Sequence, residues 1–188
     1  MKSSFPKLEG NRVCLREFTE CDLGEFARYR ALPEVARYQS WERYTLEDAQ
    51  RLYEKQLVSP YGAPGSWHQV AIADKASDAL LGDCALHFLD DGTELEIGFT
   101  LAPERQGRGL AREAVGLLLD HAFGAMRMRR VLAITDAENL PAHKLLEALG
   151  FRKEAVRDVV FKRKQGSEWI FMADGGSFSG SSAPLRSP

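Results

Sequence analysis

A chain of 188 residues, 44% hydrophobic and 28% charged, has the composition of an ordinary soluble protein and the length of one domain. Its 25 basic and 27 acidic residues leave a net charge of -2, which gives no electrostatic case for binding nucleic acid or a membrane surface. There is no apolar signal region and no membrane-length apolar run. Because the three cysteines and four histidines lack disulfide or metal-ligand spacing, we expect a cytoplasmic protein with reduced thiols and no bound metal.

The first half of the chain shows a mixture of strand and helix patterns. We expect residues 1–10 to form an N-terminal extension and residues 11–174 to form the domain. Thr19 and Thr45 each precede an amphipathic segment and are expected to cap a helix. In chain order, the patterns predict a half-buried strand over residues 12–17, a helix over 22–30, a short helix from Pro33 and a longer helix over 46–57. A loop over 59–66 and two strands over 67–73 and 80–88 follow.

The second half predicts a strand, helix and strand followed by a helix and a closing hairpin. The two strands of the first unit are expected to be parallel because a helix connects them. Residues 175–188 are rich in Gly, Ser and Pro and are expected to be a flexible tail. The predicted elements are strands over 94–101 and 130–135, helices over 109–125 and 141–149, and a hairpin of 151–161 with 168–173 whose turn lies near Gln165-Gly166.

The most informative segment is the Gln106-Gly107-Arg108-Gly109 turn that opens directly into a helix. A glycine-rich turn at a helix N-terminus presents unpaired N–H groups at the positive end of the helix dipole, which favours an anion such as phosphate. A nucleotide P-loop is excluded because Leu110 and Ala111 stand where Lys and Ser or Thr are required. A dinucleotide-binding turn lacks its third glycine, whose place is taken by an arginine.

A third class of phosphate loop fits better. Gln106-x-x-Gly109-x-Ala111 resembles the Q/R-x-x-G-x-G/A pyrophosphate loop of the GNAT acyl-CoA N-acyltransferases. The stretch EIGFTLAPERQGRGLAREA, followed by ITDAENLPAHKLLEALGF, resembles the ribosomal-protein N-acetyltransferase branch (RimJ/RimL-like) of that family. The early RVCLRE and the aromatic Trp41 fit the same branch. The resemblance covers residues 11–173.

The resemblance implies an α/β (α+β) GNAT fold, in which a mixed, mostly antiparallel twisted sheet is flanked by helices. Its central parallel strands splay apart, and acetyl-CoA, the co-substrate, lies between them. The resemblance implies that pantetheine pairs with the backbone of Phe99, Thr100 and Leu101 and is also contacted by Asn139. It implies that the pyrophosphate binds to the loop formed by Gln106, Gly107, Arg108, Gly109, Leu110 and Ala111. Alternatives are that the glycines are turn residues alone, that Arg108 is a solvated charge, and that Asn139 is only a helix cap.

Two carboxylates are candidates for the base that accepts the amine proton. Glu94 and Glu96 alternate with apolar residues, so both lie on one face of the strand beside the implied thioester. The alternative is that they attract a cationic acceptor or pair with an arginine of a neighbouring strand. A main-chain N–H near Phe99 is the candidate donor for the developing oxyanion.

The proton donor for the leaving thiolate is not identifiable. The Tyr found in many relatives is here Leu146, and the Ser found in the RimJ/RimL-like branch is here Ala142. Water, or the nearby His143, are the remaining candidates, although a surface position for His143 is the simpler interpretation. For the acceptor amine, Tyr38 and Trp41 belong to an aromatic segment that predicts an apolar, acid-rimmed pocket.

The sequence therefore predicts an enzyme that moves an acetyl group from acetyl-CoA to a primary amine by direct attack. An α-amino group (pKa ~8) is more readily neutral than lysine (pKa ~10.4), and the branch favours a protein N-terminal α-amine as partner. The alternatives are a small amine or antibiotic as acceptor, or an acyl-CoA-binding protein without catalysis. We expect a monomer or homodimer with no nucleic-acid or membrane partner.

Overall fold

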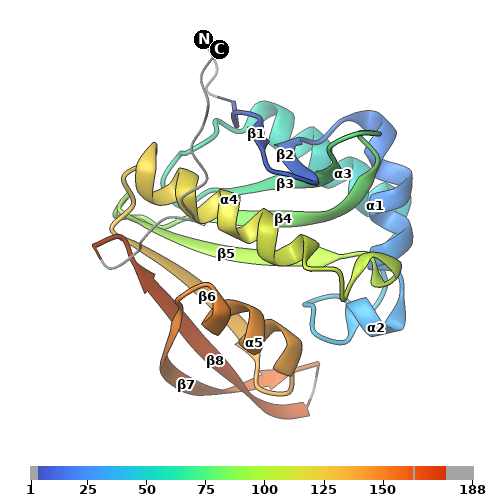
Figure 1. The fold of residues 1–188 in the computed structure, drawn as a ribbon. Coiled ribbons are helices and arrows are strands. Elements are labelled where there is room, and N and C mark those ends of the chain that lie inside the picture. The colour runs from blue at the N-terminus through green and yellow to red at the C-terminus, as the bar shows by residue number, and fades with distance from the viewer. Residues whose placement is uncertain (1–3, 163, 177–188) are drawn as a thin grey trace.

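An eight-stranded sheet runs through the part of the chain that the computed structural model describes, residues 4–162 and 164–176 (Figure 1). Its strand order is β1-β2-β3-β4-β5-β6-β8-β7, and every neighbouring pair is antiparallel except β5 and β6. The strands are β1 (Leu8–Glu9), β2 (Val13–Glu17), β3 (Trp67–Asp74), β4 (Leu80–Phe88), β5 (Glu94–Leu101), β6 (Arg130–Asp136), β7 (Arg152–Phe161) and β8 (Lys164–Asp174).

Helices cover both faces of this sheet. In Figure 1, α4 crosses one face of the large part of the sheet, while α5 packs beside β6 and β8. The apolar faces of α1 and α3 pack against the opposite face. The helices are α1 (Leu23–Arg30), α2 (Pro33–Ala36), α3 (Leu46–Val58), α4 (Leu110–Gly124) and α5 (Leu140–Ala148), with short 3₁₀ turns at Glu20–Asp22 and Pro103–Arg105.

Two apolar clusters hold these layers together. The larger joins α4 to the sheet and includes the fully buried Leu118 and Leu119 of α4 with Leu95 of β5. The smaller lies under α1 and is centred on Phe26 and Tyr29. Because successive side chains of a strand point to opposite faces, the burial of Leu95 toward α4 directs its neighbours in β5 toward the α1 side.

The parallel pair at the centre of the sheet is short. β5 and β6 pair through Glu94 with Arg130, Leu95 with Val131 and Glu96 with Leu132, and no further. Beyond this point β6 continues to pair with β8, and β5 with β4. The predicted parallel arrangement across α4 is therefore confirmed, and the two strands separate toward their C-terminal ends.

The N-terminal residues differ from the expected extension. Phe5 is 4% exposed within the α4 cluster, and Leu8–Glu9 pair with β2 as an edge strand. Residues 5–9 thus belong to the folded domain, because an aromatic side chain placed before the first predicted strand completes the core. At the other end, Gly175 and Gly176 are described, and the rest of the predicted tail lies outside the described residues.

The predicted helix starts and the closing hairpin are mostly confirmed. Thr19 and Thr45 both form capping boxes, with Asp22 and Asp48 as the third residue. β8 begins at Lys164, earlier than expected, so Gln165 and Gly166 lie inside the strand rather than at its turn. The longer strand arises because β7 continues to pair with β8 as far as Phe161.

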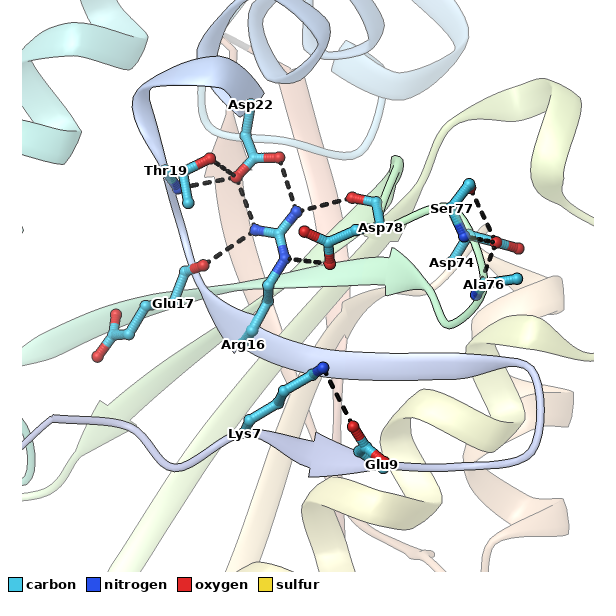
Figure 2. Close-up of polar contacts among 10 residues, drawn as sticks. All are labelled: Lys7, Glu9, Arg16, Glu17, Thr19, Asp22, Asp74, Ala76, Ser77 and Asp78. Atoms are coloured by element: carbon cyan, nitrogen blue, oxygen red, sulfur yellow. Dashed lines mark hydrogen bonds and ion pairs between the residues drawn. The ribbon is translucent and has the colours of Figure 1, made fainter.

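An arginine of β2 fixes the start of α1 to the sheet (Figure 2). Arg16 donates to both carboxylate oxygens of Asp22, at 2.7 and 3.0 Å, and to Asp78 Oδ1 at 2.8 Å. Burial favours the neutral acid, but Arg16 and the N–H and hydroxyl of Thr19 outweigh it and lower the pKa of Asp22. This network ties the start of α1 to β2 and to the turn between β3 and β4.

Candidate active site

A cleft of about 650 Å³ enters the sheet where β5 and β6 separate. One side is formed by the end of β5, the glycine turn, the start of α4 and the start of α5. The other is formed by α1, α2, the segment after α2, and parts of β4, β6, β7 and β8. We call these two parts the loop half and the helix half.

The loop half begins on the open edge of β5. Toward β4, this strand is fully paired through Leu101, but toward β6 its pairing stops at Glu96. In an antiparallel ladder every second residue turns its backbone groups away from the partner strand, and the register makes these residues Phe99 and Leu101. Their main-chain groups face the cleft, whereas the main chain of Thr100 pairs with Asp83 of β4; all three residues line the cleft. Unpaired main-chain groups along a strand edge favour an extended, amide-bearing ligand.

The glycine turn continues this wall. Gly107 and Gly109 have φ of +72° and +75°, a left-handed conformation that favours glycine, and Gly109 is the N-cap of α4. The first N–H groups of α4 lack intrahelical acceptors and lie at the positive end of its dipole. Gly107, Gly109, Leu110 and Ala111 line the cleft, so the turn forms an anion cradle that opens into it.

Two members of the predicted loop site have other roles. The Gln106 N–H is already donated to Pro103 O at 3.1 Å, and its side chain donates to Leu101 O at 3.0 Å. Gln106 lines the cleft but ties the turn to the end of β5. Arg108 does not line the cleft, and its carbonyl oxygen accepts a hydrogen bond from Arg12.

Asn139 stands at the far side of the loop half. It lines the cleft and is the N-cap of α5, where its Oδ1 accepts the Ala142 N–H at 3.3 Å. The capping alternative is therefore confirmed. It uses only the oxygen of the side-chain amide, so a contact from the amide nitrogen to a ligand is compatible with it.

The helix half is built on a buried polar network. Asp83 of β4, 1% exposed, accepts hydrogen bonds from Tyr29, Arg30 and Gln69, with Arg30 Nη2 at 2.8 Å. Burial disfavours the charged form of Arg30, but Asp83 offsets this and raises its pKa. Burial and then the Asp83 carboxylate raise the pKa of Tyr29, which stays a proton donor.

Carboxylates mark the rest of the helix half. Glu34, Asp136 and Glu168 line the cleft, and Glu168 also pairs with Arg157 at 2.6 Å. At the loop half, the charged lining residues are instead cationic, Arg112 and Lys144. Arg30, the cation that lines the helix half, is paired with Asp83, so the remaining lining charges of the two halves are opposite in sign.

Two contacts bridge the mouth of the helix half. Arg37, directly after α2, pairs with Glu138 before α5 at 2.9 Å. Lys162 donates from its ammonium group to Ala36 O at 2.7 Å, joining the end of the β7–β8 hairpin to α2. The first contact joins the helix half to the start of α5 in the loop half, and the second joins two elements of the helix half.

Of the two predicted acceptor residues, one lies in the cleft. Tyr38 lines the helix half beside Val35 and Gln39. Trp41 does not line it; its indole N–H donates to Arg30 O at 3.1 Å, and its ring lies 4.4 Å from the Arg30 guanidinium carbon. Trp41 therefore packs against the buried network that forms the wall.

The structure separates the two candidate bases. Glu94, 8% exposed at the start of β5, is held by the guanidinium groups of both Arg129 and Arg130. This is the arginine pairing that the sequence left open, and it lies at the closed end of the parallel pair. Glu94 does not line the cleft and its carboxylate is occupied by two arginines, so it is not placed to accept a proton from an amine bound there.

Glu96 lies nearer to the cleft, although it is not among the lining residues. It faces the α1 side, and its Oε2 lies 3.2 Å from His87 Nδ1. His87 in turn stacks on Trp67 at a ring-centroid distance of 4.4 Å. Ala85 and Gly98, two residues along the same strands, do line the cleft, so the His87–Glu96 pair adjoins it.

The two α5 positions at which relatives carry a proton donor differ in their placement. Leu146 is fully buried in the core, whereas Ala142, 8% exposed, lines the cleft. The expected surface position of His143 is wrong: it is 4% exposed, stacks on Trp169 at 4.3 Å, and its Nε2 lies 3.1 Å from Asp136 O. His143 does not line the cleft.

None of the three cysteines lines the cleft. The buried thiols of Cys14 and Cys84 have raised pKa values because burial disfavours the thiolate. No group of three or more His, Cys, Asp or Glu side chains capable of holding a metal ion occurs among the described residues. Nor do they include a helix both long and apolar enough to cross a membrane.

Comparison with known proteins defines the class. Residues 12–152 match the family model described as the acetyltransferase (GNAT) domain. The chain therefore belongs to the GNAT acetyltransferase family, and its mixed sheet with one parallel pair and flanking helices is the GNAT fold. It is 30% identical over 146 residues to a Bacillus licheniformis protein named uncharacterized N-acetyltransferase p20, covering 77% of this chain and 82% of that one.

Two solved structures share the fold and carry names that bear on the ligand. Mycobacterium smegmatis RimJ, in complex with CoA-disulfide, superposes with a TM-score of 0.78 at 19% identity, covering 90% of this chain and 87% of that one. Vibrio cholerae spermidine N-acetyltransferase, in complex with CoA and spermine, superposes with a TM-score of 0.77 at 20% identity, covering 89% and 98%. These identities establish the shared fold alone.

Proposed function

We propose that this protein transfers the acetyl group of acetyl-CoA to a primary amine, which attacks the thioester directly. The observation that carries this proposal is one cleft that joins a strand edge, an anion cradle and a carboxylate-lined wall. Family membership and the CoA complex of the neighbour RimJ support acetyl-CoA as the donor.

The donor would lie along the loop half. Its pantetheine amides would pair with the open backbone groups of Phe99 and Leu101, on either side of Thr100, and its pyrophosphate would accept hydrogen bonds from the N–H groups of Gly107 to Ala111. Asn139 would donate to the pantetheine arm. The thioester then reaches the point where β5 and β6 separate, at the boundary with the helix half.

The chemistry needs a neutral amine at that boundary. The amine nitrogen forms a bond to the acetyl carbon, the carbon–sulfur bond breaks, and the amine loses one proton while the CoA thiolate gains one. Glu96, alone or through His87, accepts the amine proton by way of water, and solvent water protonates the thiolate. A main-chain N–H near Phe99 stabilises the oxyanion.

The helix half favours a cationic acceptor. Glu34, Asp136 and Glu168 attract an ammonium group and raise its local concentration before deprotonation. A protein N-terminal α-amine is the favoured acceptor because its pKa of ~8 makes the neutral form accessible. A small polyamine is the second candidate, since the spermidine N-acetyltransferase shares this fold.

Turnover on an acceptor panel tests this proposal. Release of free CoA thiol would be followed with acetyl-CoA and peptides bearing free N-termini, lysine-containing peptides with blocked N-termini, spermidine and an aminoglycoside. The proposal predicts acetylation of at least one amine. Tight CoA binding without transfer to any of them would favour an acyl-CoA-binding protein instead.

A further inference from the structure

The residue just before β2 reaches the glycine turn from outside the cleft. Arg12 lies 96 residues before Arg108, yet its Nη1 donates to the Arg108 carbonyl oxygen at 2.8 Å. Its Nε donates to Oε2 of Glu113, in the first turn of α4, at 2.9 Å. The two sides of this guanidinium therefore hold the turn and the helix that the turn opens.

Glu113 is held in turn by the backbone of the same N-terminal segment. Its Oε1 accepts the N–H of Arg12 at 2.7 Å and that of Val13 at 3.3 Å. Burial favours its neutral form, but these donors and the Arg12 guanidinium outweigh it and lower the pKa of Glu113. The carboxylate stays charged at neutral pH, and it joins α4 to the backbone of Arg12 and Val13 as well as to the Arg12 side chain.

The direction of one N–H in the cradle depends on this contact. In a planar trans peptide, the Arg108 C=O and the Gly109 N–H point in opposite directions. Because Arg12 holds the carbonyl oxygen outside the cleft, the Gly109 N–H is directed to the opposite side of the peptide plane. Gly109 itself lines the cleft.

The turn needs an outside constraint because it is made of glycines. Gly107 and Gly109 have φ of +72° and +75°, and glycine crosses to other conformations at little steric cost. Rotation of the Arg108–Gly109 peptide would aim its carbonyl oxygen at a bound anion. The attraction between the Gly109 N–H and the anion would then be replaced by repulsion between the Arg108 carbonyl oxygen and the anion.

We propose that Arg12 is a positioning residue that locks the Arg108–Gly109 peptide in the orientation required for binding the pyrophosphate of CoA. This inference rests on the proposed function, because the peptide orientation matters only if the turn binds that group. The guanidinium acts through its forked geometry, in which Nε and Nη1 are used at once. A lysine ammonium offers a point charge without that fork.

Isothermal titration with CoA and with pantetheine, which lacks the pyrophosphate, tests the inference. Arg12→Met and Arg12→Lys are compared with Arg51→Met, which removes the same charge from an exposed arginine of α3 that pairs with Glu47 at 3.2 Å. We expect Arg12→Met to weaken CoA binding roughly tenfold, as expected for loss of a charged hydrogen bond. Arg12→Lys should weaken CoA binding almost as much as Arg12→Met, and Arg51→Met should leave the affinity for CoA unchanged.

The ligand pair separates the possible outcomes. Pantetheine affinity should be unchanged in both Arg12 variants, which a general loss of structure would not produce. If Arg12→Met does not fold, Arg12→Lys decides the matter: wild-type affinity for CoA in that variant contradicts the positioning role. If the wild-type protein itself does not bind CoA, the proposed function fails rather than the role of Arg12.

Discussion

The two halves of the cleft are built in different ways. The loop half uses main-chain groups of one nearly continuous segment, from Phe99 to Ala111, with Asn139 added from α5. The helix half uses side chains brought together from α1, α2, β4, β6, β7 and β8. The first presents a backbone edge and a helix terminus, and the second presents a buried ion-pair network and carboxylates.

This difference explains what each half can specify. A backbone edge and an N–H cradle depend on conformation, so they suit a donor whose pantetheine and pyrophosphate are always the same. Side chains can change without changing the fold, so the helix half is where acceptor choice resides. The two halves can therefore be tested separately, the loop half by its affinity for CoA and the helix half by the stability of its wall.

The largest expected effect is on the loop half. Gly109→Asp should weaken CoA binding by more than about 100-fold, because it adds a charge beside the pyrophosphate and places a Cβ at a φ of +75°. The matched control is Gly62→Asp, whose φ of +82° imposes similar backbone strain in a loop away from the cleft. Equal CoA affinity for both variants, by calorimetry, would contradict the cradle.

In the helix half, the corresponding effect is on stability. Asp83→Asn should lower the free energy of unfolding by about 3 kcal/mol, because it leaves the buried Arg30 without its carboxylate. Urea unfolding measures this, with Asp90→Asn in the exposed β4–β5 turn as control. A loss no larger than that of the control would show that the network does not hold this wall.

At the boundary between the halves, Glu96 and Glu94 form a matched pair on one strand. Glu96→Gln should lower kcat roughly tenfold or more and remove the acidic limb of the pH–rate profile. Glu94→Gln should preserve that limb, because Glu94 is occupied by Arg129 and Arg130. If the limb survives in Glu96→Gln and only KM changes, Glu96 binds the acceptor instead of accepting its proton.

The smallest expected effect concerns the Arg16–Asp22 ion pair that fixes the start of α1 to the sheet. The pKa of Asp22 is lowered in the folded protein, so its contribution to stability is present above its ordinary value of 3.8 and is lost as pH falls through the folded value. Asp22→Asn should therefore flatten the acid side of the stability profile, measured by urea midpoints between about pH 2 and pH 5. An unchanged dependence of stability on pH in this range would show that the ion pair of Asp22 does not stabilise the fold.

The loop half was largely predictable from the sequence. Its glycines, the helix after them and the parallel strands depend on local patterns, and the same is true of the caps at Thr19 and Thr45. Its functional assignment came from the resemblance of two separated motifs. The bracing contact from Arg12 was not predictable, since it joins residues about 100 positions apart.

The helix half was mostly not predictable for a physical reason. The contact of His87 with Glu96 depends on the register of β4 against β5, and turn lengths alone do not determine register. The burial of His143 depends on Trp169, which arrives from a later strand. The aromatic segment pointed to Tyr38 correctly as a cleft residue, but Trp41 packs on Arg30 instead.

The central claim is that the separation of β5 and β6 holds the donor with its pyrophosphate on the glycine turn. A crystal structure of the protein with CoA tests this most directly. We predict pyrophosphate oxygens within hydrogen-bonding distance of the Gly109 N–H and its neighbours, and pantetheine along Phe99 to Leu101. CoA bound elsewhere, or a pyrophosphate with no contact to the turn, would contradict the account.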